Sequence, residues 1–381
     1  MGGGMHVLFT APTLTDSDLT LLEEIADYRS RLRWQLHEPK RWTGSLRRLS
    51  FARNIQGSNS IEGFVAGLDD VAEVVARQDP IGLDEGTRQA LIGYREAMTY
   101  VLQMSDDDDF DYDERLLKSL HFMMTSDSLA NRPGLWRTGA IFVRRDIDGS
   151  IVYEGPDIGE VPHLIRELCG SLNESSTEPP LVRAALAHLN LVMVHPFRDG
   201  NGRAARCLQS LVLARTGVLS PVFMSIEEYL GQHTQEYYDV LATVGGGSWQ
   251  PARDTRPWVE FMMTAHVRQA QTLLDRVRES EHLWIALSEL VADLRLPERS
   301  LAALFDAAQG MKVRNGTYRA SFEIASEQIS EQTAGGDLRR LVEAGLLETR
   351  GERRGRHYVA GAPLVELMDR IRGGRSISAF R

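Results

Sequence analysis

The sequence predicts a mainly α-helical protein with one small β-hairpin near its middle and a separate C-terminal domain of helices and a β-ribbon. Apolar residues recur at helical spacing from the segment 16–34 onward, and few glycines or prolines interrupt these segments. Two short β-rich stretches each flank a turn, the first within 137–154 and the second within 345–359. These observations favour a helical bundle followed by a smaller module.

Composition excludes several classes of protein. The chain has 381 residues, 43% of them hydrophobic, and a formal net charge of −10, so it is no general polyanion binder. Its two cysteines, Cys169 and Cys207, lie in apolar helical context and do not form a disulfide framework. No membrane span and no signal peptide is apparent, and we expect a cytoplasmic protein.

The chain is organised around the polar segment 195–206, HPFRDGNGRAAR, which lies between the apolar helical segments 181–194 and 207–214. Pro196 and the triplet Gly200-Asn201-Gly202 interrupt the helical pattern, so the segment predicts a tight loop that opens a new helix. Glycines permit positive φ at both flanks of Asn201, which would turn backbone N–H groups toward one point.

The side chains of this loop suit phosphate chemistry. Backbone N–H groups at a helix N-terminus favour an anion, and Arg203 and Arg206 would project from one face of that helix. Asp199 offers a hard oxygen ligand for Mg²⁺, and His195 is a candidate general base. The spacing therefore predicts a site for phosphoryl or nucleotidyl transfer.

The segment resembles the signature of the Fic family, His-x-Phe-x-(Asp/Glu)-Gly-Asn-Gly-Arg-x-x-Arg, at every specified position. The resemblance implies a Fic helical bundle that transfers AMP from ATP to a Ser, Thr or Tyr hydroxyl of a target protein, or to itself. In this family the histidine takes the hydroxyl proton, the acidic residue holds Mg²⁺ and the phenylalanine anchors the loop. These roles would fall to His195, Asp199 and Phe197.

The remaining signature positions would bind ATP. The resemblance assigns the α- and β-phosphates to Gly200, Asn201 and Gly202, and the β- and γ-phosphates to Arg203 and Arg206. A helix expected over 226–242 carries Tyr229, Tyr237 and Tyr238. The resemblance implies that a tyrosine of this region lies against the adenine; Tyr238 is the candidate, and a core aromatic is the alternative.

A second motif lies upstream at the end of a predicted helix, within the region 41–63. Ser58 and Glu62 would share one helical face, and Gly63 would stop the helix. The segment resembles the Fic inhibitory motif (Ser/Thr)-x-x-x-Glu-(Gly/Asn). The resemblance implies that Glu62 pairs with Arg206 and obstructs the productive pose of ATP.

The β-rich segment 137–154 precedes the signature and resembles the Fic flap. In the family the flap backbone pairs with the target segment, a role that would fall to Ile141, Phe142 and Val143. A purely structural hairpin is the alternative.

We expect three regions: an arm and helix over 1–40, a Fic domain over 41–280, and a C-terminal domain over 281–381 that resembles a winged helix–turn–helix. A recognition helix over 333–345 would carry two arginines, and the wing four. These are Arg339, Arg340, Arg350, Arg353, Arg354 and Arg356. Contact with DNA and contact with protein, including homodimerisation, both stay open, the latter favoured.

Three functions compete. The first is an AMP-transferring enzyme restrained by Glu62. The second uses the same residues to remove AMP from modified proteins, with Glu62 orienting a water molecule. The third is a DNA-binding regulator that senses nucleotide. The intact signature argues against it, because sensing alone does not need the candidate base His195.

Overall fold

The computed structural model describes residues 7–37, 42–144, 149–216, 220–323 and 328–378. Its helices are α1 (Asp16–His37), α2 (Thr43–Ile61), α3 (Leu68–Val75), α4 (Glu85–Ser105), α5 (Glu114–Thr125), α6 (Val161–Asn173), α7 (Pro180–Val194), α8 (Asn201–Ala214), α9 (Pro221–Met224), α10 (Glu227–Gln232), α11 (Thr234–Gly245), α12 (Arg256–Asp293), α13 (Leu301–Ala308), α14 (Asn315–Glu323), α15 (Glu331–Glu343) and α16 (Ala362–Ser378). Its strands are β1 (Phe142–Arg144), β2 (Ile151–Glu154), β3 (Leu347–Arg350) and β4 (His357–Ala360). The mainly α-helical prediction is confirmed.

The helices form two compact units. The first holds described residues up to 33, together with 54–65 and 84–271, and the second holds 34–53, 66–83 and 272 onward. Three helices, α1, α2 and α12, contribute residues to both units.

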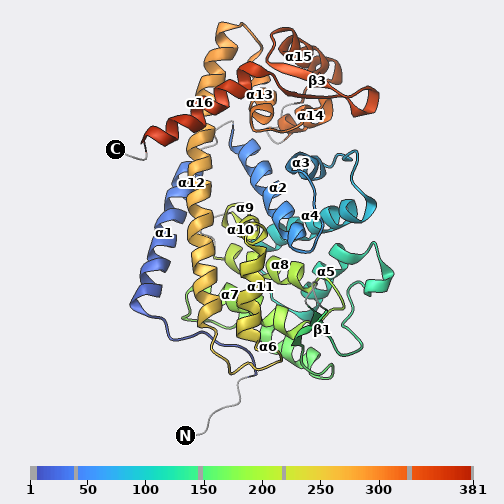
Figure 1. Ribbon diagram of the computed structural model, residues 1–381, viewed down its shortest axis with the longest axis vertical. Coiled ribbons are helices and arrows are strands. Elements are labelled where there is room, and N and C mark those ends of the chain that lie inside the picture. The colour runs from blue at the N-terminus through green and yellow to red at the C-terminus, as the bar shows by residue number, and fades with distance from the viewer. Residues whose placement is uncertain (1–6, 38–41, 145–148, 217–219, 324–327, 379–381) are drawn as a thin grey trace. The chain divides into compact units, whose positions relative to one another are not determined.

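The core of the first unit is the antiparallel pair α7 and α8, which packs against α4 and α5 (Figure 1). Nearly every residue of α8 is buried, which explains why its sequence shows apolar or small side chains at most steps. Asp84 and Asp113 cap α4 and α5 by accepting hydrogen bonds from the N–H groups of Thr87 and Leu116. These caps fix the first turns of α4 and α5, the two helices that pack against α8.

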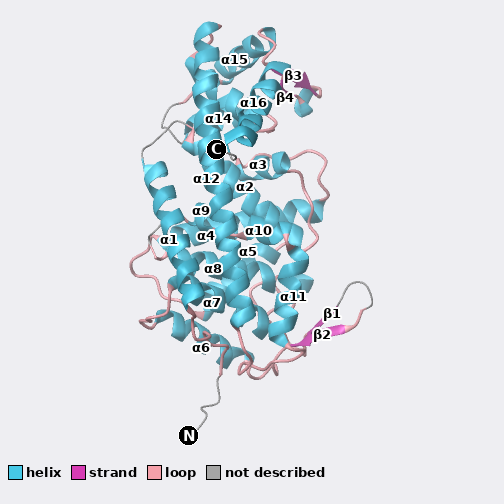
Figure 2. Cartoon of the chain, turned by 60° about the vertical axis from the view of Figure 1, so that its left-hand side comes forward, coloured by secondary structure: helices cyan, strands magenta, loops and turns pink. Residues whose placement is uncertain are grey.

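Strands β1 and β2 pair antiparallel and stand at one edge of the first unit (Figure 2). Val143 faces Tyr153 in the register, and the Tyr153 hydroxyl donates to the Met193 carbonyl at 2.8 Å. The predicted hairpin is therefore present and tied to the end of α7. The predicted turn at 145–148 lies outside the described residues.

In the second unit, α13, α14 and α15 precede the antiparallel ribbon of β3 and β4. Val313 adds a bridge to Tyr358 in β4, so a third short stretch of chain joins the ribbon. Asp337 on α15 is buried and accepts two hydrogen bonds from Arg299 and one from the Tyr318 hydroxyl. This network ties α15 to the helices before it.

Three predictions about helices were wrong. The expected helix over 226–242 is two helices, α10 and α11, which meet at His233 with non-helical backbone angles. The His233 ring stacks on Tyr229, a contact that the residue pattern does not reveal. A single helix, α12, runs through residues 280 and 281, where a domain boundary was expected, and the helices α14 and α16 were not predicted.

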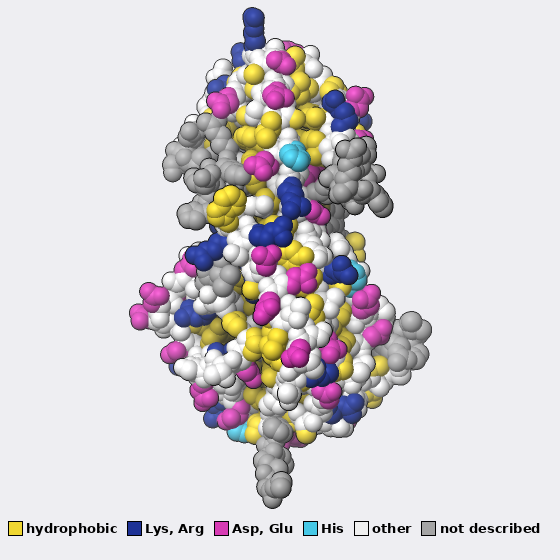
Figure 3. Space-filling model, turned by 90° about the vertical axis from the view of Figure 1, so that its left-hand side faces the viewer, with side chains coloured by type: hydrophobic (Ala, Val, Ile, Leu, Met, Phe, Trp, Pro, Cys, Tyr) yellow, Lys and Arg dark blue, Asp and Glu magenta, His cyan; other side chains and the backbone are white. Residues whose placement is uncertain are grey.

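Among the described residues, no helix combines the length and the apolar character needed to cross a membrane. On the face shown in Figure 3, acidic and basic side chains are interspersed among hydrophobic ones. Both cysteines, Cys169 and Cys207, are buried and free.

Candidate active site

The loop between α7 and α8 is shaped by two residues with positive φ. His195 ends α7 at φ 49°, and Gly200 precedes α8 at φ 74°. Between them, the Asn201 side chain accepts a hydrogen bond from the Phe197 N–H and donates one to the Phe197 carbonyl. Phe197 is fully buried, so the predicted anchor is confirmed. The amide side chain of Asn201 thus closes the loop, a role that the sequence did not reveal.

His195 lies in this loop with its ring partly buried. Its Nδ1 is 3.1 Å from the Val192 carbonyl, which can only accept, so Nδ1 carries the proton and Nε2 is left as an acceptor. Burial lowers the pKa of His195 below its usual value, which the bond to Val192 partly offsets. A neutral imidazole with an open Nε2 is the form that a general base requires.

Arg137 holds the backbone of the loop and of the flap together. Its side chain donates to the carbonyls of His195 at 2.9 Å, Gly139 at 2.7 Å and Pro156 at 2.5 Å. The side chain is buried, so no solvent competes for these bonds. One guanidinium therefore joins the candidate base to both ends of the hairpin segment.

Arg206 is fully buried and meets the end of α2. Its Nε donates to the Ser58 hydroxyl at 2.7 Å, and its Nη2 donates to the Ser58 carbonyl at 3.0 Å and to Glu62 Oε1 at 2.7 Å. Gly63 follows at φ 84° and ends the helix. The residues predicted to form an inhibitory cluster are thus brought together by segments 144 residues apart in sequence.

Glu62 also occupies the space above Gly202. A Cβ atom on Gly202 would lie 2.5 Å from Glu62 Oε1 and 3.1 Å from Arg206 Nη1. Gly202 lies within α8 and is not among the positive-φ residues. The expectation that both flanking glycines adopt positive φ was therefore wrong for Gly202. Glycine is needed at this position because a side chain would collide with Glu62.

The electrostatics of Arg206 follow from its surroundings. Burial acts to lower its pKa, but the neighbouring groups together, the Glu62 carboxylate first among them, outweigh burial and raise the pKa. Its Nη1 has no hydrogen-bond partner in the part of the chain that the structure describes. A buried, charged donor that faces Gly202 is suited to a phosphate oxygen.

A second polar network lies in the core beside this cluster. His188 contacts Gln209 Oε1 through Nδ1 at 2.6 Å and the Tyr237 hydroxyl through Nε2 at 2.9 Å. Burial lowers the pKa of His188 to about 3, so the ring is neutral at pH 7. Sequence patterning did not identify this network, because its members lie on apolar helix faces.

The other predicted ATP ligands differ in exposure. Arg203 is 3% exposed; its Nη2 lies 3.8 Å from Asp199 Oδ2, and its guanidinium lies over the Phe64 ring. Tyr238 is 44% exposed and donates from its hydroxyl to the Ile61 carbonyl at 3.0 Å, at the end of α2. Tyr237, not Tyr238, is the core aromatic of this pair.

Asp199 is the candidate ligand for Mg²⁺. Its Oδ1 accepts from the Gly200 N–H at 2.7 Å, its Oδ2 lies 3.4 Å from Asn131 Nδ2, and about half of the side chain is exposed. No group of three or more His, Cys, Asp or Glu able to hold a metal occurs among the described residues. One exposed carboxylate fits Mg²⁺ that takes its other ligands from water and from substrate phosphates.

The predicted flap residues lie on and beside β1. Phe142 is 40% exposed, while Ile141 and Val143 are partly buried. The Ile141 carbonyl accepts from the Gly155 N–H at 3.2 Å, which closes the base of the hairpin near Arg137.

Comparison with known proteins finds a family model and several relatives that are similar to the region of this site. Residues 111–213, which include α5, the hairpin, α7 and α8, match the family model described as Fic/DOC family. A Caenorhabditis elegans protein named protein adenylyltransferase fic-1 is 27% identical over 262 residues, which are 66% of this chain and 46% of the relative. Protein adenylyltransferase Fic of Drosophila melanogaster is 29% identical over 261 residues, 66% of this chain and 48% of the relative.

Among solved structures, a Fic family protein from Desulfovibrio desulfuricans G20 superposes with a TM-score of 0.58 at 24% identity, over 92% of this chain and 98% of that chain. This likeness concerns the fold. The chain spans about half the length of the curated relatives that it matches. The signature residues 195–206 lie within the segment 111–213 that matches the Fic/DOC family model.

Proposed function

We propose that this protein transfers AMP from ATP to hydroxyl side chains of target proteins and of itself. The observation that carries the proposal is one loop that holds a histidine with an unprotonated Nε2 at one end and a helix N-terminus suited to an anion at the other. Protein adenylyltransferases among the relatives support the same reaction.

The chemistry uses groups already in position. The target hydroxyl attacks the α-phosphorus of ATP, the new O–P bond forms as the bond to the pyrophosphate oxygen breaks, and His195 Nε2 takes the hydroxyl proton. Pyrophosphate leaves from the N-terminus of α8, where unpaired N–H groups and the helix dipole favour negative charge.

The phosphates would lie over Gly202, between the start of α8 and the Arg206 guanidinium. Arg206 Nη1 supplies an unpaired donor there, and Arg203 adds positive charge beneath the loop. Asp199 would hold Mg²⁺, which neutralises phosphate charge when bound. Tyr238 would lie beside the adenine, where its exposed ring offers a stacking surface.

Glu62 restrains this reaction in the proposed account. Its carboxylate pairs with Arg206 and lies against Gly202, so it takes both the cation and the space that the phosphates need. The flap residues Ile141, Phe142 and Val143 would register a target segment by adding it as a strand.

AMP removal is the second candidate, and one observation favours it. The Glu62 side chain is 23% exposed and lies against Gly202, where the phosphates are proposed to bind. A carboxylate at this position can orient a water molecule. The same His195 would then serve the reverse proton transfer.

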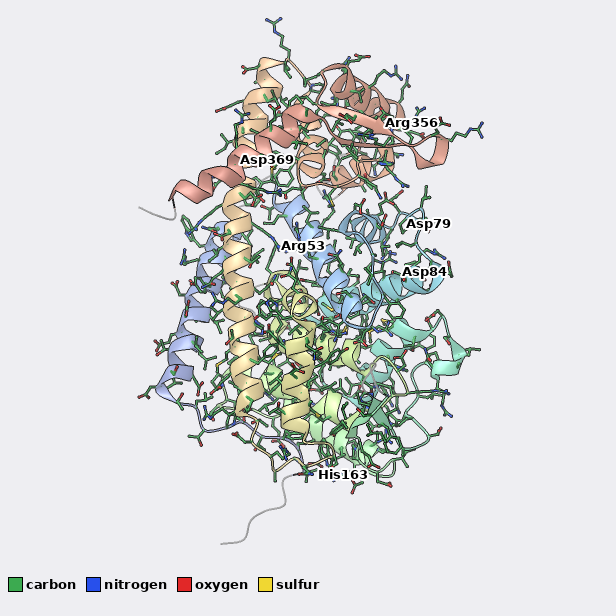
Figure 4. The ribbon with its side chains drawn as sticks, viewed as in Figure 1. Arg53, Asp79, Asp84, His163, Arg356 and Asp369 are labelled. Carbon is green, nitrogen blue, oxygen red and sulfur yellow. The ribbon has the colours of Figure 1, made fainter. Side chains whose placement is uncertain are left out.

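For the C-terminal unit we propose a winged helix that contacts protein. The order of α13, α14 and α15 followed by a β-ribbon, with Val313 bridged to the ribbon, supports it. Exposed arginines lie in the β3–β4 region, where Figure 4 labels Arg356. DNA contact through these arginines and homodimerisation are the alternatives. A cytoplasmic location, consistent with two free buried cysteines, is part of the proposal.

The test is the variant His195→Ala. We expect ATP binding to persist and AMP transfer to fall to background, because the anion site is intact and the base is absent. His163→Ala, which changes a half-exposed histidine on α6 (Figure 4), is the matched control and should transfer normally. Transfer at the normal rate by His195→Ala would refute the assignment of the base.

A further inference from the structure

His121 on α5 is a buried histidine outside the signature that contacts the catalytic loop at two points. The side chain is fully buried, and its ring stacks on Phe197 with centroids 3.9 Å apart and planes 5° from parallel. Its Nε2 lies 3.1 Å from the Asp199 carbonyl. Its Nδ1 accepts a hydrogen bond from the Gly134 N–H at 2.9 Å.

These partners fix the tautomer of His121. The Gly134 N–H can only donate, so Nδ1 is the unprotonated nitrogen, and Nε2 carries the proton. The Asp199 carbonyl accepts that proton. His121 is therefore a neutral imidazole that receives one backbone hydrogen bond and gives another.

The hydrogen bond from His121 to the Asp199 carbonyl also affects the orientation of the Asp199 side-chain carboxylate, because both are bonded to the same peptide group. The Asp199 carbonyl and the Gly200 N–H belong to the same rigid peptide unit. His121 holds the carbonyl end, and Asp199 Oδ1 accepts from the N–H end at 2.7 Å. A rotation of this peptide would break the bond to His121 and swing the carboxylate away.

Packing against α5 also restricts the rotation of the peptide between Asp199 and Gly200. A Cβ on Gly200 would meet Thr125 Cγ2 at 3.3 Å and His121 Cδ2 at 3.5 Å, so the turn lies directly against α5. On the other side of the ring, Gly134 leads to Trp136, whose ring lies 4.9 Å from that of Phe197. One imidazole thus connects the Asp199 turn to the segment that enters the flap.

We propose that His121 is a positioning residue that sets the Asp199 carboxylate for Mg²⁺ and thereby the affinity of the site for Mg²⁺-bound ATP. The proposal rests on the proposed function, because it takes Asp199 as the ligand. Hydrogen bonds that orient a metal-binding carboxylate commonly alter metal affinity or activity by about 10- to 100-fold when removed.

Three substitutions separate the two hydrogen bonds of His121. His121→Phe keeps an aromatic ring against Phe197 and removes both bonds. His121→Gln keeps a side-chain N–H donor near the position of Nε2, and His121→Asn keeps an acceptor near the position of Nδ1. Each is made in the full chain that carries Glu62→Gly, so that Glu62 does not mask ATP binding.

The measurement is the Mg²⁺ concentration that gives half-maximal ATP binding, followed by the rate of transfer from α-labelled ATP. We expect His121→Phe and His121→Asn to need about tenfold more Mg²⁺, and His121→Gln to restore most of the difference. If His121→Phe does not fold, the comparison of Gln with Asn makes the same test.

A role confined to core packing would give a different result. Thermal stability would then fall in these variants while the Mg²⁺ requirement of the folded protein stayed at that of the parent, and the proposal would be overturned. If the chain with Glu62→Gly alone, the parent, binds Mg²⁺ and ATP but transfers no AMP, the proposed function is contradicted. The Mg²⁺ requirements of the variants would still decide the role of His121. A parent without Mg²⁺-dependent ATP binding would overturn both.

Discussion

Replacing Glu62 measures the strength of the proposed restraint on ATP. The Glu62–Arg206 pair joins oxygen and nitrogen at 2.7 Å, with the two side chains 23% and 1% exposed. A shielded, charge-assisted hydrogen bond of this kind contributes about 1.5–3 kcal/mol. At about 1.4 kcal/mol per factor of ten, its loss in Glu62→Gly should raise AMP transfer by about 10- to 150-fold.

The variant Glu62→Gln refines this estimate. Its amide oxygen can still accept from Arg206 Nη2 but carries no charge, so the bond keeps the charge of Arg206 and loses the attraction between opposite charges. The loss is then roughly 1 kcal/mol, and transfer should rise about fivefold. The graded order Gly above Gln above wild type is the expected result.

The assay is the initial rate at which α-labelled AMP enters protein at a fixed subsaturating concentration of Mg²⁺ and ATP. Glu178→Gln, an exposed carboxylate in the loop before α7, controls for a change in net charge. Equal rates for wild type, Gln and Gly would refute the reasoning. Equal activation by Gln and Gly would show that charge, and not the space above Gly202, sets the restraint.

Three further predictions follow from contacts around the site. Arg137→Lys should lower transfer by about a hundredfold with ATP binding retained, because one ammonium cannot hold three carbonyls in place; transfer within twofold of wild type would contradict this positioning role. The pKa of His188 is about 3 in the folded chain and about 6.5 in the unfolded chain. Between these values the unfolded chain binds more protons, so each unit by which the pH is lowered should reduce the free energy of unfolding by up to about 1.4 kcal/mol through this group. Urea unfolding at pH 7 and pH 5, with His188→Gln as the comparison, tests this, and an equal pH slope in both proteins would count against it. Tyr238→Phe loses the bond to the Ile61 carbonyl and should raise transfer about two- to tenfold with Glu62 present; the same rise in the Glu62→Gly background would mean that the bond does not act through the restraint.

The residues of the signature could be predicted because their chemistry is local. Within the segment 195–206, a base, an anion nest, a carboxylate and two arginines follow one another, and a glycine-containing turn necessarily brings them near one helix end. The approach of Ser58 and Glu62 to Arg206 could not be worked out from spacing. It was predicted only through resemblance to a known inhibitory motif.

Arg137 and His121 escaped prediction for a physical reason. Both act on backbone carbonyls, those of His195 and Asp199, which lie 58 and 78 residues away. A carbonyl acceptor exists at every residue, so it leaves no mark on the sequence. Buried polar side chains on otherwise apolar helices are the available signal, and α5 shows one at His121.

The errors in helix boundaries have a similar origin. The domain boundary expected at 280–281 lies within α12, which continues through the polar residues 280–282 with Ser280 buried and His282 exposed. The break at His233 contains neither glycine nor proline and depends on the tertiary context of α10 and α11. Local preference is a weak guide where packing decides.

Incubation with Mg²⁺ and ATP labelled separately at the α- and γ-phosphates, for wild type and Glu62→Gly, tests the central claim most directly. The account predicts that α-label enters protein, more strongly in Glu62→Gly, and that γ-label does not. Entry of γ-label would identify a phosphotransferase. Entry of neither label, with ATP bound, would contradict AMP transfer and favour AMP removal or nucleotide sensing.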